Sequence, residues 1–180
     1  MTIVRILAGM ARNPLATANG LAVCMPLSLL IGAVLFERIG HLVPCEMCMM
    51  QRWPLVAASA IGVFAMFLRN ASHRRAAVLS AGFGILASSL IAIDHLGVER
   101  KWWEGHTACT SSMPKGLSTA DFLKEMMSMP LIRCDTPQWT MMGLSLADLN
   151  ALISGATAIA VTWLVLRSRR RGGRIAADAA

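Results

Sequence analysis

Long apolar runs without a charged side chain alternate along the chain with short charged segments. Residues 13–36 form a run of 24 residues, 53–68 a run of 16, and 76–93 and 149–166 runs of 18 each. A helix that crosses a bilayer needs about 20 mostly apolar residues, and its backbone groups must be satisfied within the segment. We therefore predict an all-α, four-helix membrane bundle, a single domain over 1–180, with spans near 18–36, 47–68, 76–97 and 146–166.

The segments outside the spans are unequal in length. A long loop, 99–145, is expected between the third and fourth spans. Within it, Ser118 and Asp121 are spaced as in a capping box, and the residues that follow separate into an apolar and a polar face, which predicts a short amphipathic helix in the membrane interface. An Arg-rich tail, 167–180, follows the last span and is expected to fray.

Composition agrees with a membrane protein. The 180 residues are 56% hydrophobic and only 15% charged, whereas a soluble domain has about 25% charged residues. The first apolar run could be a signal peptide, but no A-x-A-like cleavage site follows it, so we expect it to be retained.

Basic residues predict the orientation in the membrane. With four spans, ten arginines fall on one side: Arg5, Arg12, Arg69, Arg74, Arg75, Arg167, Arg169, Arg170, Arg171 and Arg174. That side would carry a formal charge of +9 and the other side about −2, which together give the net charge of +7. Both termini should therefore be cytoplasmic. The basic charge is explained by topology and anionic lipid, so nucleic-acid binding is not expected.

The predicted topology sorts the five cysteines. Cys45 and Cys48 lie at the outer end of the second span, Cys109 and Cys134 lie in the outer loop, and Cys24 lies alone in the first span. In a bacterial membrane protein the outer compartment is the oxidising periplasm, where disulfides persist. We expect Cys24 to be a small buried hydrophobic residue with a free thiol.

A Cys-x-x-Cys that opens a helix points to redox chemistry. The partial positive charge of a helix N-terminus favours the thiolate, which is the form that attacks a disulfide. Arg52 follows Cys48 by four residues and shares its helix face, where it could stabilise a thiolate or a reduced anionic acceptor; alternatively it only extends to the interface. Cys109 and Cys134 are separated by 24 residues, and a disulfide between them could be a structural staple or an exchangeable bond.

These residues together resemble the DsbB family of disulfide bond formation proteins. The resemblance rests on Pro44-Cys45-x-x-Cys48-x-x-x-Arg52, on Cys134-x-x-x-Gln138-Trp139-x-x-x-Gly143-Leu144, and on the Gly97-Val98-Glu99-x-Lys101-Trp102-Trp103 run; it extends from about Ala18 to Leu166. It implies an oxidoreductase of the bacterial inner membrane. The expected partner is a DsbA-like periplasmic thioredoxin-fold protein, and the expected electron acceptor is ubiquinone or menaquinone.

The resemblance also implies roles for individual residues. Cys109 would form the mixed disulfide with the partner, with Cys134 as its pair, so that the redox-active disulfides are Cys45–Cys48 and Cys109–Cys134. Cys45 would exchange with the loop, while Cys48 and Arg52 would face the quinone. His95 matches a family histidine linked to the quinone pocket, although an interface pair with Glu99, one turn away, explains it equally well.

Three other functions fit parts of the pattern. A DsbI-like oxidase would use the same chemistry on a dedicated partner. The vitamin K epoxide reductase-like group also has four helices and a CxxC motif, but there the loop pair comes first. A non-enzymatic Cu(I)-handling protein is a third possibility, because thiolates and thioethers favour Cu(I) and nine of the thirteen methionines lie on or near the outer side. We expect no resident metal, and a c-type haem is excluded because Met49 follows the CxxC.

Overall fold

The computed structural model describes residues 13–105 and 134–178, with side chains as far as Arg170. Each of its four long helices is long and apolar enough to cross a membrane, which confirms the all-α membrane fold. They are α2 (Pro14–Arg38), α3 (Glu46–Phe67), α4 (Ala71–Glu99) and α6 (Leu146–Asp178). The predicted amphipathic helix, together with Cys109, lies outside the described residues.

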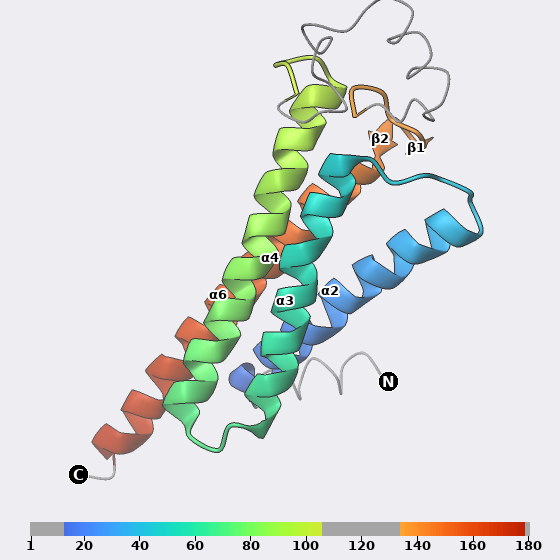
Figure 1. The fold of residues 1–180 in the computed structure, drawn as a ribbon. Coiled ribbons are helices and arrows are strands. Elements are labelled where there is room, and N and C mark those ends of the chain that lie inside the picture. The colour runs from blue at the N-terminus through green and yellow to red at the C-terminus, as the bar shows by residue number, and fades with distance from the viewer. Residues whose placement is uncertain (1–12, 106–133, 179–180) are drawn as a thin grey trace, which may run out of the picture.

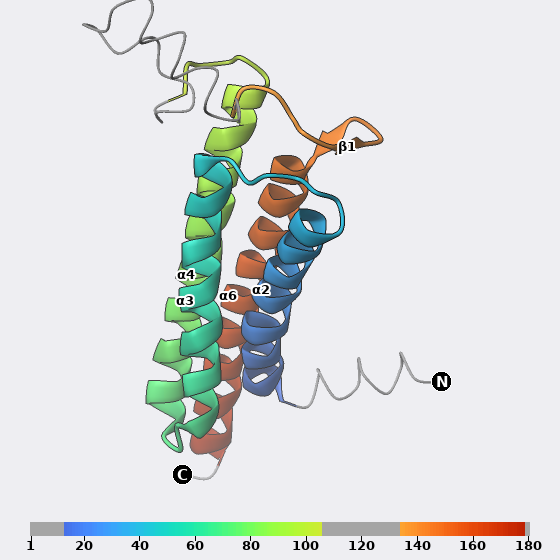
Figure 2. The ribbon, with the colours of Figure 1, turned by 45° about the vertical axis from the view of Figure 1, so that its right-hand side comes forward.

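The helices form an antiparallel bundle (Figure 1). α4 packs along both α3 and α6, and α2 packs against α3 and α6, as the turned view also shows (Figure 2). The α3–α4 turn and the far part of α6 meet at one end, where Arg75 Nη2 donates to the Ser168 carbonyl at 3.5 Å. The start of α3, the end of α4 and the start of α6 meet at the other end. The arginines of the α3–α4 turn and those of the far part of α6 therefore lie at the same end of the bundle.

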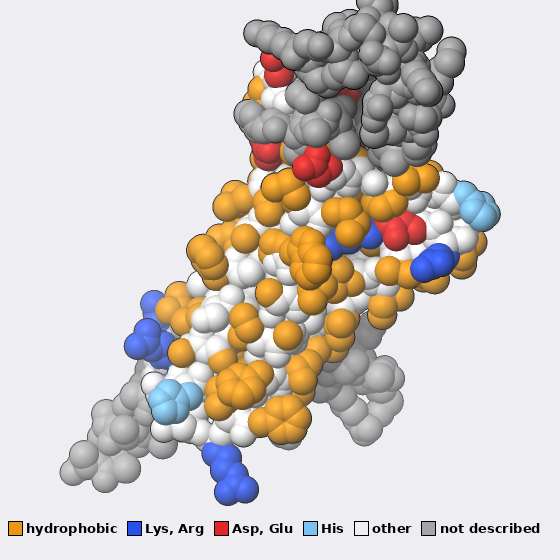
Figure 3. Space-filling view, in the orientation of Figure 1, with side chains coloured by type: hydrophobic (Ala, Val, Ile, Leu, Met, Phe, Trp, Pro, Cys, Tyr) orange, Lys and Arg blue, Asp and Glu red, His pale blue; other side chains and the backbone are white. Residues whose placement is uncertain are grey.

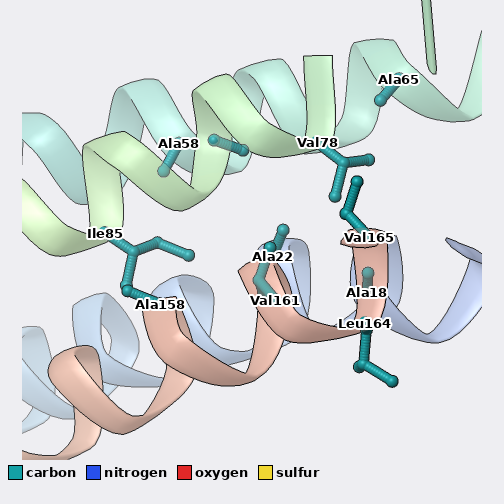
Figure 4. Close-up of a cluster of buried hydrophobic side chains, with 11 residues drawn as sticks. Ala18, Ala22, Ala58, Ala65, Val78, Ile85, Ala158, Val161, Leu164 and Val165 are labelled. Carbon is teal, nitrogen blue, oxygen red and sulfur yellow. The ribbon is translucent and has the colours of Figure 1, made fainter. Parts of the chain in front are cut away.

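Small residues form the centre of the bundle. Alanines from α2, α3, α4 and α6 surround Val78, Ile85, Val161 and Val165 (Figure 4). In lipid, helices associate through close van der Waals packing, which small residues allow. The outer face is apolar instead: Phe67 is 78% exposed and Phe83 73%, and Figure 3 shows such side chains over the middle of the face.

Two expectations about the helices are corrected. Cys24 is a free thiol, but it is exposed on α2 rather than buried, because α2 packs through the face that carries Ala18 and Ala22 and Cys24 lies on the opposite side. The last helix also continues beyond residue 166 to Asp178. Arginine and alanine are strong helix formers, so the Arg-rich tail extends the helix rather than ending it.

Local caps and contacts brace the end that carries the cysteines. A short hairpin, β1 (Thr140–Met141) and β2 (Leu144–Ser145), leads into α6. Ser145 N–H donates to Asp148 Oδ2 at 2.9 Å, and Asp148 N–H donates to Ser145 Oγ at 3.2 Å, a reciprocal cap of the α6 N-terminus. Arg100 Nη2 also donates to both oxygens of Asp148, at 3.1 and 3.3 Å, so the end of α4 is tied to the start of α6.

Candidate redox site

Cys45 and Cys48 lie together at the start of α3. Cys45 is the N-cap residue, and its Sγ accepts a hydrogen bond from the Cys48 N–H at 3.2 Å. The two Sγ atoms are 2.8 Å apart. Both are free thiols here, so conversion to a disulfide, with an S–S bond of about 2.05 Å, needs only a small movement of the side chains.

The two thiols of the pair are not equivalent. The pKa of Cys45 is raised above its ordinary value because its thiol donates a hydrogen bond to Cys48 and because it is buried; the backbone N–H of Cys48 acts in the opposite direction but is outweighed. In the dithiol, Cys45 is the hydrogen-bond donor and Cys48 Sγ is the acceptor.

Cys134 approaches this pair from the segment that precedes the hairpin. Its Sγ, the Cys45 Sγ and a ring nitrogen of His95 all lie within 4.8 Å of one another. Cys134 and Cys45 are 1% and 3% exposed, and Met47 and Val98 pack around them. The structure thus places a loop cysteine beside the outer cysteine of the CxxC motif. Since Cys109 lies outside the described residues, the Cys109–Cys134 pair stays a prediction.

His95 lies inside this cluster. It is 3% exposed, its Nε2 is 3.6 Å from Cys45 Sγ and 3.7 Å from Glu99 Oε1, and its Nδ1 is 2.8 Å from Gln51 Nε2. The pair with Glu99 is therefore present, but it lies within the cysteine site rather than at a plain interface. The role of His95 toward a quinone stays a prediction.

Arg52 has an ionic partner that the sequence does not reveal. Its guanidinium forms an ion pair with Glu37, on the last turn of α2, and the two side chains are 20% and 23% exposed. Its Nη1 also contacts Met49 Sδ at 3.6 Å. Arg52 is therefore held between α2 and α3 by an acid that lies outside the recognised motif.

A cavity of about 240 Å³ lies beside the cysteine pair. Apolar residues of α2 and α6, among them Leu29, Ala33 and Ile153, form much of its wall. Its polar lining includes Cys45, Cys48, Gln51, Arg52, His95 and Glu99. An apolar cavity with a few polar groups on one side suits a small organic ligand.

Aromatic residues lie where the loop meets this cavity. The Phe36 and Trp139 rings pack with centroids 5.1 Å apart, and both line the cavity. Gln138 Nε2 donates to the Val43 carbonyl at 2.7 Å, which ties the segment after Cys134 to the connection before Cys45. The Gln138-Trp139 pair thus helps to seat Cys134 over the start of α3.

Uncharged polar residues of the site were missed from the sequence. Gln51, Asn150 and Ser88 join the cluster through hydrogen bonds deep in the bundle. The available signal was an amide side chain inside an apolar run: Asn150 lies in the run 149–166, and Gln51 lies between Cys48 and Arg52. Both side chains are uncharged, so the charge pattern along the sequence does not mark them.

The same donor atoms bear on metal binding. Two thiols and an imidazole within 4.8 Å would suit a soft ion such as Cu(I). The methionines give this possibility less support: Met47 is buried, but Met142 is 97% exposed, and Met113, Met126, Met127 and Met129 lie outside the described residues.

Comparisons with known proteins indicate one family. Residues 16–164 match the family described as "Disulfide bond formation protein DsbB". The chain is 29% identical over 137 residues to "Disulfide bond formation protein B" of Azoarcus sp. (strain BH72), covering 71% of this chain and 78% of that protein. It is 27% identical over 124 residues to the uncharacterized protein RP370 of Rickettsia prowazekii (strain Madrid E), covering 68% and 71%. No solved structure matches the chain.

Proposed function

Because this chain belongs to the DsbB family, and is thus a multi-pass membrane protein of disulfide bond formation, we propose that it is a thiol:quinone oxidoreductase. It takes two electrons from the dithiol of a DsbA-like thioredoxin-fold partner and passes them to a membrane quinone. The supporting observation is the cluster of three sulfurs, in which Cys45 lies close to both Cys48 and Cys134, beside a cavity that Cys45 and Cys48 line.

The relay begins at the loop. A partner thiolate attacks Cys109 of the Cys109–Cys134 disulfide, and Cys134 leaves as a thiolate. Cys134 then attacks Cys45 Sγ, its neighbour in the cluster, which forms a Cys45–Cys134 disulfide and releases Cys48 as a thiolate. The second partner thiol resolves the mixed disulfide at Cys109, and Cys109 in turn attacks Cys134 and releases Cys45.

The second half of the relay takes place at the cavity. The dithiol of Cys45 and Cys48 is oxidised back to a disulfide, and the quinone takes up the two electrons and two protons to become a quinol. Cys48 and Arg52 both line the cavity, where Arg52 stabilises negative charge that develops on the sulfur or on the quinone oxygen. Ubiquinone and menaquinone both present such an oxygen.

The proposed location is the bacterial inner membrane, with both termini in the cytoplasm and the cysteine pairs in the periplasm. The distribution of arginines supports this orientation, since the Arg-bearing α3–α4 turn and the arginines after the last span lie at one end of the bundle. The cysteines lie at the opposite end, where an oxidising compartment would maintain them as disulfides.

Turnover tests this proposal directly. The purified protein, given a reduced thioredoxin-fold oxidase and a soluble ubiquinone, should reduce the quinone, as followed by its ultraviolet absorbance. Cys45→Ser and Cys48→Ser should each abolish turnover. Cys24→Ser is the matched control and should keep full activity, because Cys24 is exposed on the far side of α2. Full activity in Cys45→Ser or Cys48→Ser would refute the assignment.

Measuring Cu(I) binding by the same purified protein tests the alternative function of copper handling. Its structural support is the cluster of Cys45, Cys134 and His95. One Cu(I) bound per reduced protein, without quinone turnover, would favour copper handling. Turnover with a dedicated partner but not with a general oxidase would instead indicate a DsbI-like protein.

A further inference from the structure

A chain of buried hydrogen bonds leads from α3, α4 and α6 to His95. The direction of each bond, from donor to acceptor, can be worked out from one end, where a backbone carbonyl can only accept. Ser88 Oγ, on α4, donates to the backbone carbonyl of Gln51 on α3, at 2.8 Å. A carbonyl oxygen has no proton to give, so the single hydroxyl proton of Ser88 is committed to this bond. Any further contact of Ser88 Oγ must therefore be one in which it accepts.

The next link is Asn150 on α6. One atom of its amide lies 3.3 Å from Ser88 Oγ, and because that oxygen accepts, this atom is Nδ2, as assigned. The other side of the amide is compatible with this orientation, because the Ser154 hydroxyl, 2.8 Å from Asn150 Oδ1, can donate to it. Nδ2 has a second proton, which it gives to Gln51 Oε1 at 2.7 Å.

The Gln51 amide is thereby oriented as well. With Oε1 toward Asn150, its Nε2 faces His95 Nδ1 at 2.8 Å, and an amide nitrogen can only donate. His95 Nδ1 is therefore an acceptor without a proton. The other ring nitrogen, Nε2, faces acceptors instead: Cys45 Sγ at 3.6 Å and Glu99 Oε1 at 3.7 Å. The backbone carbonyl of Cys134 is a further hydrogen-bond acceptor for the ring.

From this polarity we propose that Ser88, Asn150 and Gln51 are positioning residues that hold neutral His95 with its proton on Nε2, on the side of the ring that faces Cys45 and Cys134. His95 thus donates a hydrogen bond to the reacting sulfur and is not the base that removes its proton. The role of Cys45 as that sulfur rests on the proposed function. The tautomer itself does not, because it follows from the hydrogen bonds alone.

A hydrogen-bond donor at His95 Nε2 would help Cys45 to leave as a thiolate. Cys45 must leave as a thiolate when Cys109 resolves the Cys45–Cys134 disulfide, yet burial raises the pKa of its thiol and disfavours the charged form. A hydrogen bond from Nε2–H to the departing sulfur offsets part of this penalty. Exchange at Cys45 should therefore depend on residues of α4 and α6 that touch no sulfur.

Nitrogen-15 NMR of the full-length protein, labelled at histidine and reconstituted in nanodiscs, tests the tautomer without any redox reaction. The His95 signals are identified by their loss in His95→Gln. Wild type should show a protonated Nε2 and an unprotonated Nδ1. In Gln51→Glu the carboxylate can accept from both Asn150 Nδ2–H and His95 Nδ1–H, so the proton should move to Nδ1. Wild type with its proton on Nδ1, or an unchanged tautomer in Gln51→Glu, would overturn the proposal.

A kinetic arm uses reduction of the Cys45–Cys48 disulfide by the reduced partner in the absence of quinone. Ser88→Ala and Gln51→Leu should slow this half-reaction about five- to tenfold, the effect expected from weakening one hydrogen bond. Ser89→Ala is the matched control, because buried Ser89 Oγ also links α4 to α6, donating to the Ala151 carbonyl at 2.9 Å, but lies outside the chain. An equal slowing in Ser89→Ala would mean a merely structural effect and would refute the positioning role. If Gln51→Leu fails to fold, Ser88→Ala and the NMR arm still decide.

Discussion

Glu37, on the last turn of α2, forms an ion pair with Arg52, in the second turn of α3. Both side chains line the cavity that also contains Cys48. The acid holds the guanidinium in place, since an unpaired arginine would extend toward water. It also offsets the positive charge, so a reduced anionic acceptor meets an arginine that is already partly neutralised.

The first prediction concerns this pair. Arg52→Ala should raise the KM for quinone by about tenfold or more, the effect expected from losing a hydrogen bond to a charged group. It should leave reduction of the Cys45–Cys48 disulfide by the partner within about twofold, because Arg52 lies on the cavity side of the pair. Steady-state quinone titration and single-turnover reduction measure the two effects separately.

Two further variants serve as controls for Arg52. Arg52→Lys keeps the charge but not the planar fork of donors, and should lie between wild type and Arg52→Ala. Glu37→Gln keeps Arg52 charged but unpaired, and should alter the KM for quinone less than Arg52→Ala does. An unchanged KM for quinone in Arg52→Ala would remove Arg52 from the acceptor site.

The second prediction concerns the contact between Cys45 and Cys134. With Cys48→Ser, Cys45 loses its partner in the motif, and its nearest remaining described thiol is Cys134. Once Cys109→Ser also removes the proposed disulfide partner of Cys134, a Cys45–Cys134 disulfide should accumulate under oxidising conditions. Peptide mapping without reduction detects it.

The control adds Cys134→Ser to the Cys48→Ser and Cys109→Ser variant, and there the cross-link must vanish. Adding Cys24→Ser instead should leave the cross-link intact. If Cys45 remains a free thiol in the oxidised double variant, then the described arrangement of the two sulfurs does not occur during exchange.

The four spans were predictable because a charge-free run of about 20 residues has few alternatives in a membrane protein. The exposure of Cys24 was not predictable. The first span is apolar on all sides, so its sequence does not reveal which face meets protein and which meets lipid. Nor was the length of α6 predictable from hydropathy, since its arginines end the apolar run without ending the helix.

The site also has a part that the sequence predicted and a part that it did not. Cys45, Cys48 and Arg52 share one helix face, so local spacing was enough to group them. The partners of the site come from other helices, namely Glu37 on α2 and Asn150 on α6. Such contacts depend on tertiary packing, and no spacing along the chain encodes them.

The third prediction tests the packing of α2 against α3. A Cβ at Gly62 would lie 2.7 Å from Val23 Cγ2 and 3.3 Å from the Ala22 carbonyl oxygen, and Val has little rotamer freedom in a helix. Gly62→Ala should therefore destabilise the bundle by about 1–3 kcal/mol. Gly20→Ala is the matched control, because a Cβ there meets nothing within 4 Å. Thermal unfolding in detergent should separate the two variants; equal melting temperatures would contradict the close approach.

The fourth prediction concerns orientation. Reporter domains fused after residues 72 and 170 should lie in the cytoplasm, because the arginines near these positions resist translocation. A fusion after residue 42, between α2 and α3, should lie in the periplasm. Paired alkaline phosphatase and fluorescent protein fusions give opposite signals on the two sides, so each junction is its own control. A fusion at 72 that reports the periplasm, or one at 42 that reports the cytoplasm, would invert the topology and place the cysteine pairs in a reducing compartment, where a disulfide relay would not stay oxidised.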